Sequence, residues 1–143
     1  MSGTIQDLWF DQLTTRQLHD LLRLRCDVFV VEQNCPYAEV DGLDLVARHV
    51  WIDSDGDIVA ALRVIPDDDH VKVGRVVTHP QHRSRGLARR LLLHVLDDTH
   101  MVEIEAQAHL ADWYRGFGFE LTGPEFDLDG IAHVPMKRVP TVG

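Results

Sequence analysis

Apolar residues recur at helical spacing in three segments of the chain. Behind Thr14, which has a glutamine three residues later and so fits a capping box, leucines repeat every three to four residues. This pattern predicts a first helix over residues 15–30. A second amphipathic helix is expected over residues 87–98. A third, shorter one covers residues 110–117 and ends at Gly118, a residue that commonly terminates helices.

Strand-like runs lie between these helices. Segments 47–53 and 58–65 flank an Asp-Gly-rich turn, which is typical of a hairpin, and further runs cover 71–78 and 101–106. Weaker strand patterns lie at residues 8–10, 119–121 and 131–137, the last two on either side of an Asp-Gly turn. The order is strand, helix, three strands, helix, strand, helix and two strands. It predicts an α/β (α+β) fold with a mixed sheet of about six to seven strands flanked by helices.

Composition narrows the class of protein. A length of 143 residues favours a single domain over residues 1–143, with 45% apolar and 26% charged residues. The net charge of -9 argues against nucleic acid as the main partner. Two cysteines make no disulfide framework, and we find neither a secretory leader nor an apolar run of about 20 residues. We therefore expect a cytoplasmic protein with no membrane partner, either a monomer or a homodimer.

The turn at residues 83–88 stands out against this acidic background. It follows a strand and opens a helix, so backbone N–H groups without helical partners would face whatever lies in front of them. Gly86 lets the backbone approach a ligand closely, and arginines surround it. The chain contains neither the P-loop pattern nor the dinucleotide fingerprint. The turn therefore predicts a site for the phosphate or pyrophosphate of a small ligand.

These motifs resemble those of a known family. The sequence Arg-x-x-Gly-x-Ala at 83–88 is similar to the acyl-CoA pyrophosphate loop of GNAT-superfamily N-acetyltransferases, and 114–119 resembles their Tyr-x-x-x-Gly-Phe element. The segment 28–37, continuing through Asp41 to Asp44, resembles the ElaA-like branch of that superfamily. The resemblance covers nearly the whole chain. It implies the GNAT fold and acetyl-CoA as co-substrate; direct transfer requires no metal.

The resemblance also implies which residues hold the co-substrate. Backbone groups at the end of the strand 71–78 would bind the pantetheine arm, and the N–H of Val77 would polarise the thioester oxygen. Tyr114 would protonate the departing sulfur as general acid; the alternative is an aromatic residue of the core. The implied cofactor-binding set is Val76, Val77, Thr78, Arg83, Ser84, Arg85, Gly86, Leu87, Ala88 and Arg89.

The general base is harder to assign, because segment 71–79 lacks the glutamate that many members of the superfamily carry there. Glu32 and His49 are the foremost candidates, and a satisfied structural histidine is the alternative for His49. The other acids considered are Asp41, Asp44 and Glu105.

Charged residues of the N-terminal half are candidates for substrate binding. Asp41 and Asp44 lie on a long acidic loop where they could attract a cationic amine. Arg25 and Arg75, like Arg63, could bind a substrate carboxylate or could pair with those acids.

Three functions follow. The first is transfer of an acetyl group from acetyl-CoA to an amine of a small molecule or peptide, by direct attack in a ternary complex. The second is a non-catalytic acyl-CoA-binding sensor, which the missing glutamate favours. The third, which the short chain disfavours, is an acyltransferase like the acyl-homoserine-lactone synthases.

Overall fold

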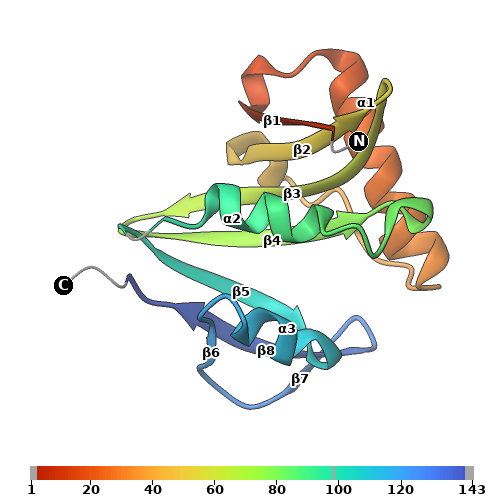
Figure 1. Ribbon diagram of the computed structural model, residues 1–143. Helices are drawn as coiled ribbons and strands as arrows, with labels where there is room; N and C mark the ends of the chain where they lie inside the picture. The colour runs from red at the N-terminus through yellow and green to blue at the C-terminus, as the bar shows by residue number, and fades with distance from the viewer. Residues whose placement is uncertain (1–2, 98, 141–143) are drawn as a thin grey trace.

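A computed structural model describes residues 3–97 and 99–140 and shows one mixed sheet of eight strands (Figure 1). The strand order is β1-β2-β3-β4-β5-β8-β6, and β7 pairs with β8. The strands are β1 (Thr4–Trp9), β2 (Arg48–Ser54), β3 (Asp57–Asp67), β4 (His70–Thr78), β5 (Met101–Gln107), β6 (Glu120–Leu121), β7 (Phe126–Leu128) and β8 (Ile131–Arg138).

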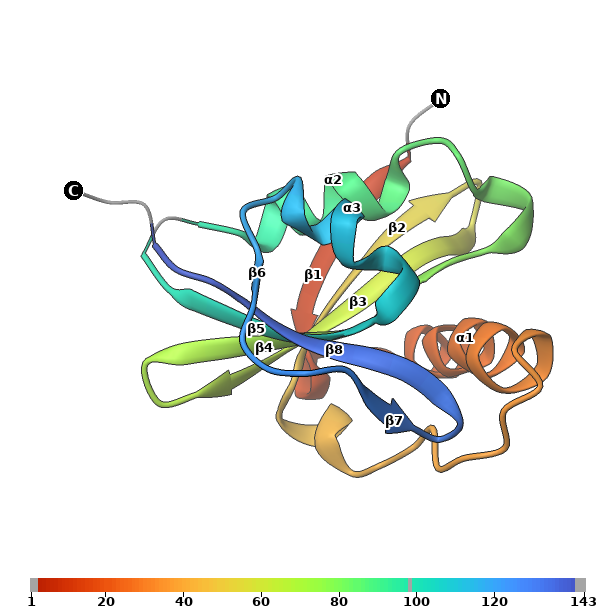
Figure 2. The same cartoon turned by 90° about the horizontal axis from the view of Figure 1, so that it is seen from below.

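Helices cover both faces of the sheet. Figure 2 shows α1 on one side and α2 and α3 on the other. The helices are α1 (Thr15–Arg25), α2 (Leu87–Val95) and α3 (Ala111–Arg115), a π-helical segment η2 (Cys26–Glu32), and the short 3-10 helices η1 (Phe10–Gln12), η3 (Leu43–Val46), η4 (Pro80–His82) and η5 (Ala108–Leu110). One apolar core fills the α2/α3 side and includes Leu91, Leu92 and Phe119. A smaller core, with Leu21 and Trp51, lies under α1.

The only parallel pair among the described strands is β4–β5, and it is short. Pairing runs from His70 opposite Met101 to Lys72 opposite Glu103 and then stops, although both strands continue. The remainder of β4 pairs only with β3, and the remainder of β5 only with β8. The two central strands therefore diverge and leave a gap in the middle of the sheet.

The predicted fold class is confirmed, with differences in detail. Thr14 caps α1 as expected, but the regular helix ends at Arg25 and continues as π-helical turns to Glu32. The second helix ends at Val95 rather than 98, and residue 98 lies outside the described residues. The Asp-Gly turn joins β8 to β7, a strand that the sequence pattern did not indicate. In the described ranges no helix is both long and apolar enough to cross a membrane.

Candidate active site

A β-bulge shapes β4 where the gap opens. Arg75 has a φ of 51°, and the register between β3 and β4 shifts between Ala61 and Arg63. The extra residue changes the phase of the strand, so that Val73 and Val76 both pack on the core beneath α2 and α3, whereas Val77 packs on the α1 side.

The register decides which amides of β4 face the gap. His79 donates its N–H to the Val59 carbonyl of β3 at 2.8 Å. Because N–H groups alternate along a strand, Val77 also points at β3, opposite Ala61. The amides of Val76 and Thr78 then face the open side. The role predicted for Val77 as oxyanion donor requires an amide that is not used by the sheet, whereas this register directs that amide at β3; the role stays a prediction.

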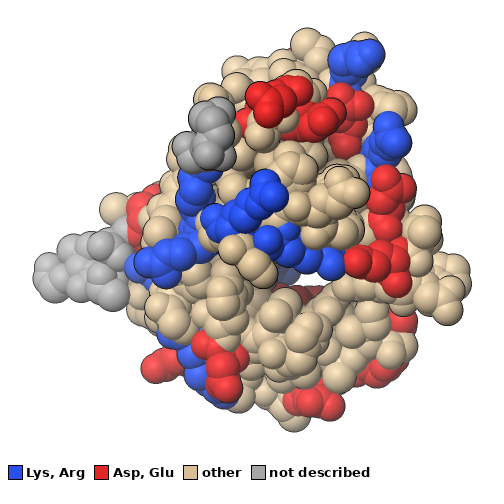
Figure 3. Space-filling model, turned by 45° about the vertical axis from the view of Figure 1, so that its right-hand side comes forward, with Lys and Arg blue, Asp and Glu red and all other residues tan. Residues whose placement is uncertain are grey.

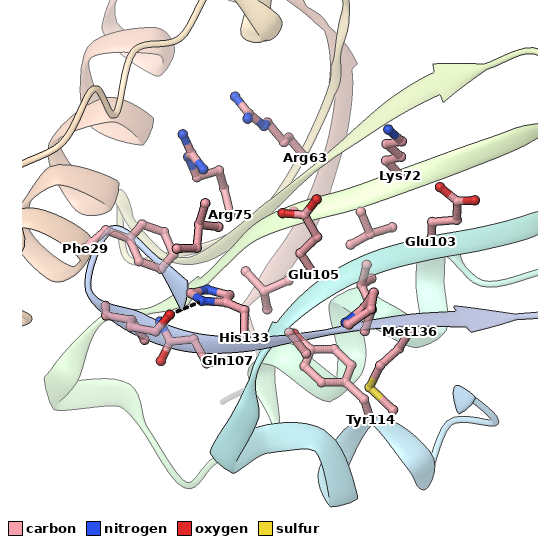
Figure 4. Close-up of a pocket in the computed structure, with 18 of the residues that line it drawn as sticks. Phe29, Arg63, Lys72, Arg75, Glu103, Glu105, Gln107, Tyr114, His133 and Met136 are labelled. Carbon is pink, nitrogen blue, oxygen red and sulfur yellow. Dashed lines mark hydrogen bonds between the residues drawn. The ribbon is translucent and has the colours of Figure 1, made fainter. Parts of the chain in front are cut away.

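A cavity of about 580 Å³ occupies the gap and reaches both faces of the sheet (Figure 4). Phe29 and Arg63 contribute to its wall on the α1 side, and Glu105 projects from β5 into it. Tyr114 of α3 lies at the opposite end, with its ring edge-on to Trp113 at 4.9 Å. The strand backbones that border the gap are thus accessible from both sides.

Tyr114 is 6% exposed, and burial raises the pKa of its hydroxyl to about 12. The hydroxyl has no hydrogen-bond partner within residues 3–97 and 99–140, although the residue lines the cavity. A phenol this weakly acidic stays protonated at neutral pH. It is therefore a permanent hydrogen-bond donor at the far end of the gap.

The loop before α2 presents unpaired amides. Ser84 and Gly86 have positive φ angles of 65° and 73°, and the first helical bond runs from the Arg90 N–H to the Gly86 carbonyl. No side chain caps the helix at Gly86, so the amides of residues 87–89 are left for a ligand. A Cβ at Gly86 would meet no described atom within 4 Å, so the approach is open.

The arginines around this loop differ in whether other residues already engage their side chains. Arg83 is held by Glu32 through two hydrogen bonds of 2.6 and 2.9 Å, whereas Arg89 lies over the Phe117 ring. Arg85 forms no ion pair with any residue that the structure describes. Figure 3 shows basic side chains gathered in a band beside a hollow on this side of the molecule. An anion at the loop would meet Arg85 directly and would compete with Glu32 for Arg83.

Three arginines and three carboxylates form a closed ring of ion pairs beside the cavity. Arg25 binds Glu39 and Asp44, at 2.7 and 2.9 Å. Arg63 binds Asp44 and Asp41, at 3.1 and 2.7 Å. The ring is completed by Arg75, which binds Glu39 and Asp41 at 2.8 and 3.2 Å. We call these six residues the ion-pair ring.

The ion-pair ring ties the acidic loop to α1, β3 and the bulge of β4. It contains all four residues predicted to bind substrate: Arg25, Arg75, Asp41 and Asp44. Arg25 and Asp44 are only 2% and 5% exposed, so their charges satisfy each other rather than a ligand. Hydrogen bonds from Arg63 lower the pKa of Asp41 to about 2. In the structure these residues pair with one another, which was the alternative to substrate binding.

Neither foremost candidate for the base meets the cavity. His49 is 1% exposed, its Nε2 contacts the Asp44 carbonyl at 3.0 Å, and burial lowers its pKa. Glu32 is engaged by Arg83 of the loop before α2 and is not part of the cavity wall. Glu105 does line the cavity, as does His133 of β8. Sequence reasoning missed His133, because only the pairing of β8 with β5 brings it to the gap.

The splayed parallel pair, the cavity in its gap and the amide-bearing loop before α2 are typical of an acyltransferase of the GNAT type. A family model for the acetyltransferase (GNAT) domain matches residues 27–140. The chain belongs to this family, whose members take acyl groups from acyl-CoA.

Sequence relatives indicate the branch of the family to which the chain is most similar. The Escherichia coli protein ElaA is 39% identical over 144 residues, 93% of this chain and 94% of ElaA. A UPF0039 protein of Mycobacterium tuberculosis is 40% identical over 147 residues, 96% of this chain and 94% of the relative.

Solved structures agree with these sequence relatives. The crystal structure of Escherichia coli ElaA has a TM-score of 0.88 at 37% identity, covering 95% of this chain and 99% of that one. An acyl-CoA N-acyltransferase from Pseudomonas aeruginosa has a TM-score of 0.87, with the same identity and coverage. The predicted fold and the predicted ElaA-like branch are confirmed.

Proposed function

We propose that this acyltransferase transfers an acetyl group from acetyl-CoA to an amine of a small molecule or peptide by direct attack. The observation that carries the proposal is the cavity in the gap between β4 and β5, which has Phe29 and Arg63 in its wall on the α1 side and Tyr114 at the opposite end. A thioester carrier entering past α2 would put its acetyl group in the gap. An acceptor would reach the same carbon from the α1 side.

The pyrophosphate of the co-substrate would lie on the amides of residues 87–89. Ser84 and Gly86 shape the turn, and Arg85 supplies charge. Placement of the diphosphate here fixes the direction of the pantetheine arm. The arm would then run along β4 as an additional strand, using backbone groups that β5 leaves unpaired.

Charge that develops on the thioester oxygen would be stabilised by the amide of Val76, or by that of Thr78 one repeat further along the strand. A preorganised donor of this kind contributes roughly 2.7–4 kcal/mol to a transition state. Arg75, fixed by Glu39 and Asp41, holds the bulge that aims these amides. The ion-pair ring therefore acts on the chemistry through the backbone.

Tyr114 would donate a hydrogen bond to the departing sulfur. With a pKa of about 12, its proton stays on the phenol at neutral pH. A thiol near pKa 8.5 is the stronger acid, so complete transfer to the thiolate is uphill by roughly 5 kcal/mol. Stabilisation of the sulfur by a hydrogen bond, followed by protonation from solvent, is the lower-energy route.

Two measurements test this function. Calorimetry with acetyl-CoA should show binding at a single site, and thiol release should depend on an added primary amine. Binding without release for any amine in a broad panel would favour the acyl-CoA sensor instead. Absence of binding would refute both functions. A cytoplasmic location, a single domain over residues 1–143, a monomeric or dimeric state, and the absence of a metal and of nucleic acid as a partner remain predictions.

A further inference from the structure

Charged side chains of both signs line the cavity, and most of the acids among them have basic neighbours. The ion-pair ring balances three arginines with three carboxylates. Glu103 of β5 lies opposite Lys72 on β4 and Lys137 on β8, and its carboxylate contacts His70 at 3.4 Å. Basic side chains therefore flank Glu103, and they offset its charge for an incoming ammonium ion.

Glu105 has different surroundings from Glu103. Because β4 and β5 have separated before this point, it has no residue opposite it on β4, and on β8 it faces Pro135. Its carboxylate forms no ion pair or hydrogen bond with any described residue, and it projects into the gap toward β4 (Figure 4). The same divergence that opens the gap thus leaves the Glu105 carboxylate without an opposing residue on β4.

His133 lies diagonally across from Glu105 on the same face of the sheet, since it pairs with Gln107, two residues along β5. Diagonal neighbours of this kind are typically about 7–8 Å apart, within reach of long side chains and suited to one small group between them. His133 is 8% exposed and lines the cavity. Its Nδ1 contacts the Ile131 carbonyl at 2.8 Å, which requires a proton on Nδ1 and leaves the lone pair on Nε2.

We propose that Glu105 and His133 form the amine site: Glu105 binds the protonated primary amine of the acceptor, and Nε2 of His133 removes its proton before attack. This proposal rests on the proposed acetyltransferase function. It assigns the acceptor as a primary alkylamine that arrives as an ammonium ion.

The division of roles follows from ordinary acidities. An imidazole is intrinsically a stronger base than a carboxylate, so it is better able to accept a proton from an alkylammonium ion. The carboxylate is the better permanent anion, and the imidazole the better proton acceptor. Both residues lie on the acceptor side of the sheet, whereas Tyr114 lies at the other end of the cavity.

The protons balance in this scheme. The ammonium gives one proton to His133, and the neutral nitrogen attacks the acetyl carbon to form the C–N bond. The C–S bond then breaks while Tyr114 hydrogen-bonds the sulfur. The second N–H proton passes to the thiolate through solvent, and His133 releases its proton to solvent. Ammonium and thioester thus give amide, thiol and one proton.

The test uses the full chain with acetyl-CoA and a panel of primary amines of graded size, among them benzylamine, tryptamine and spermidine. Glu105→Gln should raise KM for the amine about 10–100-fold, because a charged hydrogen bond is lost, and leave the acetyl-CoA Kd unchanged. His133→Ala should lower kcat about 100-fold or more, and added imidazole should restore part of it. Unchanged calorimetric affinity for acetyl-CoA shows that each variant is folded.

Glu103→Gln is the matched control, because it removes the same charge from the same strand and face. An equal rise in KM in Glu103→Gln and Glu105→Gln would show a general electrostatic effect and overturn the role of Glu105. Wild-type rates in His133→Ala, or a loss that imidazole cannot restore, would overturn the role of His133. A wild-type protein that binds acetyl-CoA but acetylates no amine would instead refute the proposed function, which keeps the two failures distinct.

Discussion

Removal of the Asp44 charge from the ion-pair ring should cause a loss of folding stability whose size can be worked out from the structure. It is 5% exposed and binds both Arg25, at 2.9 Å, and Arg63, at 3.1 Å. Asp44→Asn keeps the shape of the side chain but leaves the ring with one uncompensated positive charge in a buried place. Breaking a buried ion pair by removal of one partner costs about 3–5 kcal/mol, and we expect about 3 kcal/mol here because the amide oxygen still accepts one hydrogen bond.

Urea unfolding of wild type and variant measures this loss, which corresponds to roughly 6–12 °C in Tm for a domain of this size. Asp27→Asn is the control: its pair with Arg23 is 3.8 Å long, with side chains 62% and 73% exposed, so we expect about 0–0.5 kcal/mol. A double-mutant cycle with Arg25→Gln should give a coupling of at least about 1 kcal/mol. A loss below about 1 kcal/mol for Asp44→Asn would refute the argument that the ring fixes the acidic loop.

Four further outcomes are expected. Tyr114→Phe should lower kcat about 10–100-fold with an unchanged acetyl-CoA Kd, and an unaltered kcat in steady-state assays would remove it from the chemistry. Gly86→Val should weaken acetyl-CoA binding at least tenfold by calorimetry, whereas Gly56→Val, at a similar φ of 85°, should cost comparable stability and leave affinity intact. Glu32→Gln should tighten acetyl-CoA binding several-fold, because Arg83 is released; weaker binding would contradict this. The contribution of Asp41 to stability is present above its ordinary pKa of 3.8 and is lost as the pH falls toward its folded pKa of about 2. The free energy of unfolding of Asp41→Asn should therefore vary less between pH 5 and pH 3 than that of wild type.

Local patterns in the sequence were sufficient for most of the fold. The capping box at Thr14 and the apolar stripe of residues 87–95 depend on neighbours three or four positions away, which a single sequence displays. The turn at Gly86 was likewise readable, because the helix start and the glycine are adjacent. The sequence pattern did not indicate β7, because three residues are too few to show the alternation of apolar and polar positions along a strand.

The site was less predictable wherever it depends on pairing between distant segments. The bulge at Arg75 shifts the register by one residue, so the amide facing the gap could not be located from the strand alone. His133 reaches the cavity only through the pairing of β8 with β5. The ion-pair ring joins residues up to 50 positions apart. Five of its members looked as suitable for substrate as for one another in the sequence, and the sixth, Glu39, was not considered.

A crystal structure of the protein with acetyl-CoA tests the central claim most directly. We predict that the diphosphate lies on the amides of residues 87–89 and that the thioester passes between β4 and β5, with its oxygen facing the amide of Val76 or Thr78 and its sulfur near Tyr114. Acetyl-CoA bound elsewhere, or a thioester remote from the gap between these strands, would contradict the account.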